Sequence, residues 1–107
     1  MNLGDFNKKL ILQKYKPTPN ETGGTWDKWE PEGFIWGKVT ELEPIEFEET
    51  GKDRRLARYE VIIRKTEITV KDRLLLDGRT LEIDYINDSD SKPPFYLKLT
   101  CLELRVN

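Results

Sequence analysis

The sequence predicts an all-β protein, a small closed or partly open β-barrel of six to seven short antiparallel strands with a long charged loop. Apolar and polar residues alternate along several short segments, which is the pattern of half-buried strands. Asp77-Gly78 stands between two runs of strand formers and indicates a two-residue hairpin turn. No long segment favours a helix and no repeat occurs, and closing the sheet would remove its exposed edges.

The expected strands are separated by segments rich in proline, glycine and asparagine. Gly37 lies within one strand and indicates a bulge or a close backbone approach. Asp77 and Gly78 tolerate the positive φ that their turn requires, so the hairpin is expected to be a rigid part of the scaffold. In order, we expect a strand over 8–15, a loop over 16–24, strands over 34–44 and 58–65, the hairpin over 73–86, a loop over 87–94 and a last strand over 95–106.

Residues 43–57 show no clean period and are expected to form a mobile loop. The loop is acidic first and basic afterwards. It is either a disordered insertion or an arm presented to a partner, and a short helical turn over 53–58 is a further option. Its charged residues are Glu43, Glu46, Glu48, Glu49, Lys52, Asp53, Arg54 and Arg55.

Composition argues against catalysis and against ordinary nucleic-acid binding. The 107 residues form a single expected domain, 1–107, with 18 basic and 20 acidic side chains and a net charge of −2. A nucleic-acid binder usually has a basic excess. The chain has no histidine and one cysteine, which removes the commonest general base and the usual zinc ligands. We therefore expect no enzyme, no cofactor and no metal site.

Cys101 lies in an apolar alternating run and is expected to be a buried, inert thiol. The chain starts at Met1 without an apolar leader and has no apolar run long enough to cross a membrane. A cytosolic product is expected.

Two acidic groups are candidate sites. Asp84, Asp88 and Asp90 could offer oxygen ligands to a cation, but they lack the pattern of a calcium loop, and a solvated turn is favoured. Glu82 and Asp84 share a face of a predicted strand, like a catalytic carboxylate pair. Without a pocket or a further acid, acid–base chemistry is not favoured.

Trp26, Trp29 and Trp36, with Phe34, are expected first in the core, second at a protein interface, and third as a stacking platform for a ligand. Four arginines fall near one part of the sheet. On an acidic chain they are expected to pair with carboxylates rather than bind phosphate. They are Arg58, Arg64, Arg73 and Arg79.

The order of these pieces resembles the phage head–tail joining family, the head-closure or stopper proteins of long-tailed bacteriophages. The resemblance starts with "LILQKY", "GGTWDKW" and "FIWGKVTELEP" and is densest from "YEVIIRK" to the last strand. Lys65 departs from the family pattern, in which an aromatic residue often follows the Ile-Arg pair. The matching positions are Ile63-Arg64, Ile68, Asp72-Arg73, Asp77-Gly78, and Cys101 followed by Glu103.

The resemblance implies a structural protein of the virion that forms a ring, commonly dodecameric, beneath the portal and adaptor rings. Such a ring closes the DNA channel of the filled capsid and docks the tail. The loop at 43–57 would point into the channel as the plug, facing packaged DNA without sequence-specific binding. Assembly would take place in the host cytoplasm, away from membranes, and the isolated chain is expected to be a monomer. Possible interface residues are Trp26, Trp29, Trp36, Arg64 and Arg73.

Three other functions remain open at this point. A tail-terminator or tail-completion protein would also belong to the virion, but it would lie in the tail, below the head–tail connector. A single-strand nucleic-acid module with an OB-like barrel would use the aromatic residues, although the basic groove is missing. An enzyme is the third, and no constellation of residues supports it.

Overall fold

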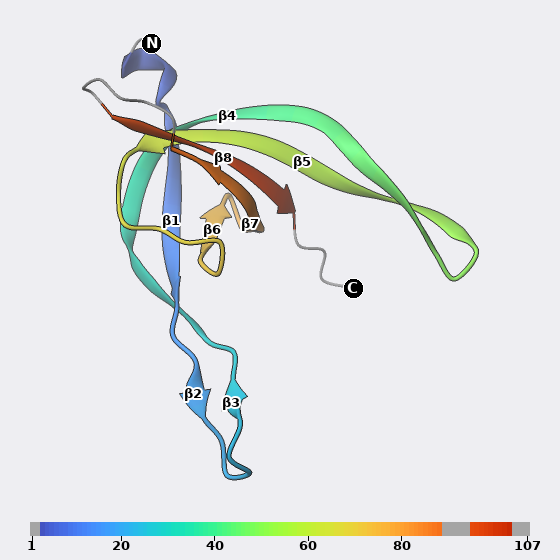
Figure 1. Ribbon diagram of the computed structural model, residues 1–107. Coiled ribbons are helices and arrows are strands. Elements are labelled where there is room, and N and C mark those ends of the chain that lie inside the picture. Colours follow the sequence, from blue (N-terminus) through green and yellow to red (C-terminus); the bar gives the residue numbers. More distant parts are fainter. Residues whose placement is uncertain (1–2, 89–94, 104–107) are drawn as a thin grey trace.

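The computed structural model describes residues 3–88 and 95–103. A short 3-10 helix is followed by strands only, and the described part contains no α-helix (Figure 1). The elements are η1 (Leu3–Asp5), β1 (Lys8–Tyr15), β2 (Thr18–Pro19), β3 (Thr25–Trp26), β4 (Trp29–Glu49), β5 (Lys52–Arg64), β6 (Arg73–Leu76), β7 (Arg79–Asn87) and β8 (Tyr96–Glu103).

Six strands pair around a closed ring in the order β1-β4-β5-β8-β7-β6, and all the pairs are antiparallel. The ring closes where β6 returns to β1, with Ile11 opposite Leu75. This confirms the predicted all-β fold and its closed form. Strands β2 and β3 form a separate small hairpin below the barrel (Figure 1).

The core fills the inside of this ring. Alternate residues of each strand point inward, as in β8, where Leu97, Leu99 and Cys101 are buried between more exposed neighbours. Each fully buried aliphatic side chain contributes about 1.5–3 kcal/mol relative to exposure. The other core residues are Leu10, Leu12, Tyr59, Val61, Ile63, Leu74, Leu76, Leu81 and Ile83.

Gly37 confirms one of its two predicted roles, the close approach. A Cβ atom there would lie 2.9 Å from Leu10 Cδ1 and 3.1 Å from the carbonyl oxygen of Ile62. The bulge in β4 lies farther along the strand, between Leu42 and Ile45, where residues 43–44 oppose Ala57 alone. Pro44, which has no N–H to donate, therefore falls in this bulge rather than in the regular ladder.

The prediction of a loop over 43–57 is wrong, because these residues form the outer parts of β4 and β5. Strand pairing runs without a break from Ile45 opposite Leu56 to Glu49 opposite Lys52. The turn is Thr50-Gly51, with φ values of 49° and 76°, which suits a tight hairpin. The optional helical turn over 53–58 is also wrong. Of this segment only Ala57, next to the barrel, packs against the core, so the rest lacks the hydrophobic period by which strands are predicted.

Other boundaries are confirmed or shifted. The Asp77-Gly78 hairpin is confirmed, with φ values of 49° and 80° between β6 and β7. The strand predicted over 34–44 already begins at Trp29, and the predicted loop over 16–24 contains β2. Most of the loop predicted over 87–94, and residues 104–106 of the last predicted strand, lie outside the described residues.

Candidate functional site

Residues 43–57, here called the arm, project from the barrel as a two-stranded hairpin (Figure 1). Strand β5 pairs with β8 only from Arg58, opposite Leu102, onward. Beyond that point the two sides of the arm pair with each other, and no other described strand joins them. An isolated two-stranded hairpin is marginally stable in water. The arm would therefore gain stability from a partner that covers it.

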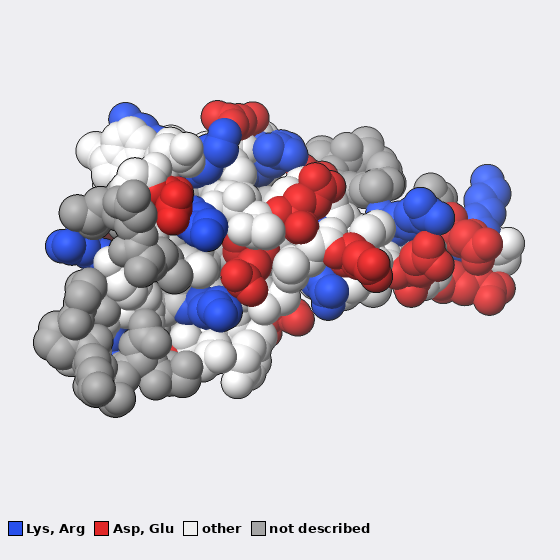
Figure 2. Space-filling view, turned by 90° about the horizontal axis from the view of Figure 1, so that it is seen from above, with Lys and Arg blue, Asp and Glu red and all other residues white. Residues whose placement is uncertain are grey.

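One face of the arm is almost entirely charged, because residues that pair directly or lie two apart share a face. Glu46 forms an exposed ion pair with Arg55 at 3.1 Å. Glu48 lies opposite Asp53, and like charges directly opposite each other destabilise a strand pair. Charged side chains crowd the arm in Figure 2. This face therefore keeps excess negative charge.

The other face of the arm carries Ile45, Phe47 and Leu56, and toward the tip it carries the charged residues Glu49, Lys52 and Arg54. Ile45 and Leu56 are half-buried, whereas the Phe47 side chain is 38% exposed. Because the hairpin projects away from the core, the barrel offers Phe47 no apolar surface on which to pack. This apolar face was not predicted, although the alternation in "PIEFEE" is its signal.

A second exposed surface lies on the outside of the barrel, where β4 pairs with β1. Phe34 is 53% exposed and Trp36 is 52% exposed, with their rings in edge contact at a centroid distance of 6.1 Å. Lys9 Nζ lies 4.2 Å from the centre of the Phe34 ring. Beside Trp36 is a hollow of about 460 Å³, lined by Phe6, Ile35, Trp36, Arg64, Lys65 and Thr66.

The first expectation for the tryptophans, a place in the core, is wrong for two of them. Trp36 faces solvent, and Trp26 on β3 is 66% exposed. Trp29 packs at the barrel end, where the Arg73 guanidinium carbon lies 3.4 Å from its ring centre. Its Nε1 donates to the carbonyl of Lys71 at 2.7 Å. Trp36 thus remains available for an interface, and Trp29 has a structural role.

The arginines differ in their partners. Arg73 pairs with Glu82 at 3.5 Å and Arg79 with Glu103 at 3.6 Å, as the expectation of carboxylate partners requires. Arg58 Nε is buried without a hydrogen-bond partner in the described part of the chain. Arg64, at the edge of the hollow, is exposed and has no ion-pair partner among the described residues.

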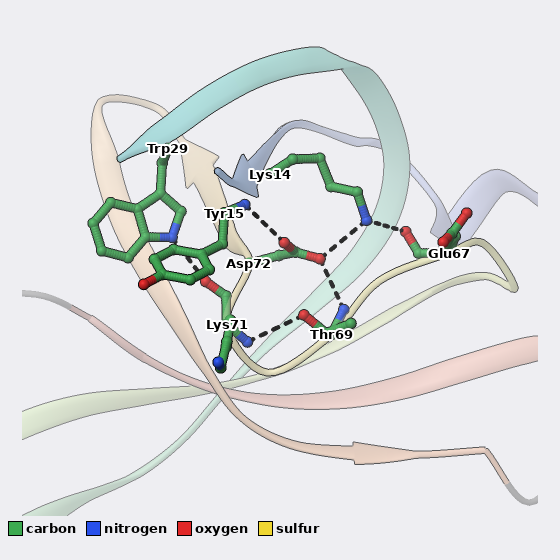
Figure 3. A network of polar contacts seen from close by, with 7 residues as sticks. All are labelled: Lys14, Tyr15, Trp29, Glu67, Thr69, Lys71 and Asp72. Atoms are coloured by element: carbon green, nitrogen blue, oxygen red, sulfur yellow. Dashed lines mark hydrogen bonds and ion pairs between the residues drawn. The ribbon is translucent and has the colours of Figure 1, made fainter. Parts of the chain in front are cut away.

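Asp72, which was predicted only as part of a family motif, ties the connection after β5 to β1 (Figure 3). Its carboxylate accepts hydrogen bonds from the backbone N–H of Tyr15 at 2.9 Å and of Thr69 at 2.8 Å, and pairs with Lys14 at 3.1 Å. Burial alone would raise the pKa of Asp72. The backbone donors and the Lys14 ammonium outweigh burial and hold that pKa below its ordinary value. A charged Asp72 therefore fixes this corner of the barrel.

The remaining candidates offer no reactive chemistry. Among residues 3–88 and 95–103, no group of three His, Cys, Asp or Glu side chains could hold a metal ion. Asp88 pairs with Lys65 at 2.9 Å, while Asp90 lies outside the described residues. Cys101 is buried as predicted, and burial raises its pKa to about 12. No helix in the described part is long and apolar enough to cross a membrane.

Comparison with protein-family models matches residues 1–104 to the phage head completion protein family. The chain belongs to this family. It is accordingly a phage virion component of the head–tail connector type, which confirms the resemblance seen in the sequence. Comparison with curated proteins found no match.

Solved structures share the fold of this phage head completion protein. A chain from the virion of a native gene transfer agent particle superimposes with a TM-score of 0.76 at 18% identity, covering 92% of this chain and 94% of that one. A Shigella flexneri 2a protein studied in solution has a TM-score of 0.68 at 21% identity, with 96% of each chain covered. The xkdH protein of the phage-like element PBSX from Bacillus subtilis has a TM-score of 0.60 at 10% identity, with 90% and 92% covered.

Proposed function

We propose that this chain forms a ring, commonly dodecameric in the family, beneath the portal and its adaptor, where it closes the DNA channel of the filled head and docks the tail. The observation that carries the proposal is the arm, a charged hairpin that leaves the barrel and has no partner strand within the described chain. Membership of the phage head completion family supports a place in the head–tail connector, and the arm would be the segment that opens and closes the channel.

The charge of the arm suits a channel that must hold DNA without binding it. The face with Glu46, Glu48 and Asp53 would be repeated around the ring, lining the opening with carboxylates. Such a wall repels phosphates, so DNA would leave quickly once the arms move aside. This mechanism involves no sequence-specific DNA contact, no cofactor and no catalysis.

The basic residues of the arm would hold the closed state. Lys52, Arg54 and Arg55 lie across from acidic or aromatic residues within the hairpin and could equally meet the glutamates of a neighbouring arm. Each exposed pair contributes about 0–1 kcal/mol. Repetition around a ring makes many such contacts strong together and sensitive to salt.

A ring requires head-to-tail contacts that close by rotation. Outside the arm, the six strands of the described chain already close on themselves as a sheet, so the barrel needs no further strand. We therefore expect a monomer in isolation that assembles on the portal-bound adaptor, with tail proteins added afterwards.

Charge reversal tests the gating role. Particles carrying Arg54→Glu and Arg55→Glu are expected to contain the folded protein but to lose packaged DNA, measured as nuclease-sensitive DNA per particle. A control with the exposed lysines Lys28→Glu and Lys98→Glu matches the charge change away from the arm. Normal DNA retention by the arm variant would rule out gating by these two arginines.

A further inference from the structure

We propose that residues 104–107 continue β8 along the free edge of β5 and add a third strand to the base of the arm. The acceptor is the edge of β5 from Asp53 to Ala57 that faces away from β4, where no described strand lies. The occupant is the segment Leu104-Arg105-Val106-Asn107, which lies outside the described residues. The inference concerns the isolated chain and does not depend on the proposed ring.

The free edge of β5 presents a regular set of backbone donors and acceptors. Just after β5, the N–H of Lys65 donates to the carbonyl of Phe95 at 2.9 Å, so the backbone groups of Lys65 face β8. Those of every second residue in a strand point to the same side, and counting back from Lys65 puts Ala57, Arg55 and Asp53 in this set. Arg55 and Asp53 therefore direct N–H and C=O groups toward a side that no described strand covers. An edge of this kind accepts a further strand.

The end of β8 selects the occupant, because β8 lies beside β5 and ends near the base of the arm (Figure 1). The two strands pair antiparallel without a shift as far as Arg58 opposite Leu102. Each further step along β8 is one step back along β5, so Leu104 would lie opposite Leu56 and the next three residues opposite positions 55, 54 and 53. The segment is already joined to the neighbouring strand, whereas any other strand would have to be brought in from elsewhere.

The apolar side chains of the segment match the apolar face of the arm. Leu104 and Val106 are two residues apart, and in this register they share the face that carries Ile45 and Leu56. Ile45 lies opposite Leu56, so Leu104 would complete an apolar row across three strands. Half-buried Leu102 lies on the same face of β8, two residues before Leu104. Apolar residues that the barrel leaves uncovered would thereby gain a partner from the same chain.

The polar residue of the segment suits the charged face of the arm. Arg105 would share the face of Glu46, Glu48 and Asp53. Neither Glu48 nor Asp53 has an ion-pair partner among the described residues, and Arg105 would lie diagonally across from Asp53, within reach of a long side chain. Arg105 would also stand directly opposite Arg55, whose charge is already offset by its ion pair with Glu46 at 3.1 Å. The added guanidinium would therefore reduce the repulsion between Glu48 and Asp53.

A third strand changes how the arm is held. A hairpin of two strands is marginally stable in water, and three or more strands are needed for independent stability. Because β8 is a core strand, with Leu97, Leu99 and Cys101 buried, the docked segment would tie the base of the arm to the barrel. Only the tip, residues 48–52, would remain two-stranded. Release of the segment would free the whole arm, so the segment would act as a latch.

A designed disulfide tests the register in the purified chain. Leu56 and Leu104 would form a non-hydrogen-bonded pair, whose Cα atoms lie about 4.5 Å apart, within the range that a disulfide spans. The variant with Leu56→Cys and Leu104→Cys is treated with a mild thiol oxidant at low protein concentration, denatured and alkylated, and its mass is measured. We expect one alkyl group per chain, on Cys101, because the other two thiols are bonded to each other. The control, Leu56→Cys with Arg105→Cys, places the second thiol on the opposite face and should carry three.

Hydrogen exchange tests the contact without new cysteines. The amide of Arg55 should be protected by the segment in the unaltered chain. A variant truncated after Glu103 should exchange this amide about tenfold faster or more, because the third strand is lost. Leu104→Ser with Val106→Ser should have the same effect at full length. The amide of Val61, in the core, should exchange at the same rate in all three proteins.

Four results would overturn the inference. Three alkyl groups on the Leu56–Leu104 variant, or an unchanged rate at Arg55 after truncation, would show that the segment does not lie on this edge. Equal disulfide formation in the Arg105 control would show that the segment has no defined register there. A disulfide between two chains, seen as a dimer on a non-reducing gel, would show that the segment of a second copy occupies the edge. The proposed ring is tested separately by DNA retention in particles, so its failure and the failure of this inference are distinguishable.

Discussion

Replacing Asp72 with asparagine should destabilise the barrel strongly. The carboxylate is 4% exposed and accepts from the backbone N–H groups of Tyr15 and Thr69 and from Lys14. Asparagine keeps one acceptor oxygen but places an NH₂ group against a donor, so one backbone hydrogen bond and the ion pair are lost. Hydrogen bonds to charged groups contribute about 1.5–3 kcal/mol each, and we expect a loss of about 3 kcal/mol of unfolding free energy.

The effect depends on pH in a defined direction. The pKa of Asp72 is lower in the folded protein than its ordinary value of 3.8. Its contribution is therefore fully present above that value and is lost as pH falls through the lower folded pKa. The stability gap between the natural protein and Asp72→Asn should be constant near neutrality and narrow progressively below about pH 4.

Denaturant unfolding of both proteins at pH 7 and at a series of acidic pH values measures this gap. Asp77→Asn is the matched control, because Asp77 is exposed in a turn with φ of 49°, which asparagine also tolerates. It should change stability by less than about 0.5 kcal/mol. Equal stability of Asp72→Asn and the natural protein at pH 7, or a gap that does not narrow in acid, would refute the reasoning.

Three other changes test the fold. Gly37→Ala should destabilise by about 1–3 kcal/mol, because its Cβ would collide with Leu10 and the Ile62 carbonyl; unchanged thermal unfolding would contradict this. Cys101 should resist a thiol reagent at neutral pH in the folded protein and react after denaturation, since burial raises its pKa to about 12; rapid labelling of the native protein would argue against it. Thr50→Asn should slow hydrogen exchange across the arm, because asparagine suits φ of 49° better than a β-branched residue; faster exchange would show otherwise.

The barrel could be predicted because each of its strands has one face toward the core. Leu97, Leu99 and Cys101 alternate with more exposed residues, and this period is visible without knowing any neighbour. The Asp77-Gly78 turn was equally visible, since its residue types tolerate positive φ. The sequence alone does not specify closure of the sheet, which depends on β6 returning to β1 across sixty residues of chain.

The arm could not be predicted as a pair of strands, for a physical reason. From residue 46 to its tip the arm is exposed on both faces, so charged and apolar residues there do not follow a single inside–outside rule. The strand pairing of the arm can be recognised only once the turn is placed at Thr50-Gly51, because Glu49 then lies opposite Lys52 and Glu46 opposite Arg55. Trp36 is of a residue type that favours the core, yet its position in β4 turns it outward. Its neighbour Gly37 faces Leu10 in the core, and adjacent residues of a strand point to opposite faces.

The structural role of Asp72 could not be predicted from the sequence for a related reason. A buried carboxylate needs donors, and two of its three lie in β1, at Lys14 and Tyr15, far away along the chain. Only the closed sheet brings them together.

A cryo-electron microscopy reconstruction of the head–tail connector in intact particles tests the central claim most directly. We expect one ring of this barrel beneath the adaptor, with the face of each arm that carries Glu46, Glu48 and Asp53 toward the channel axis. A ring whose arms point outward, or a chain located in a sixfold ring at the tail end, would contradict the account.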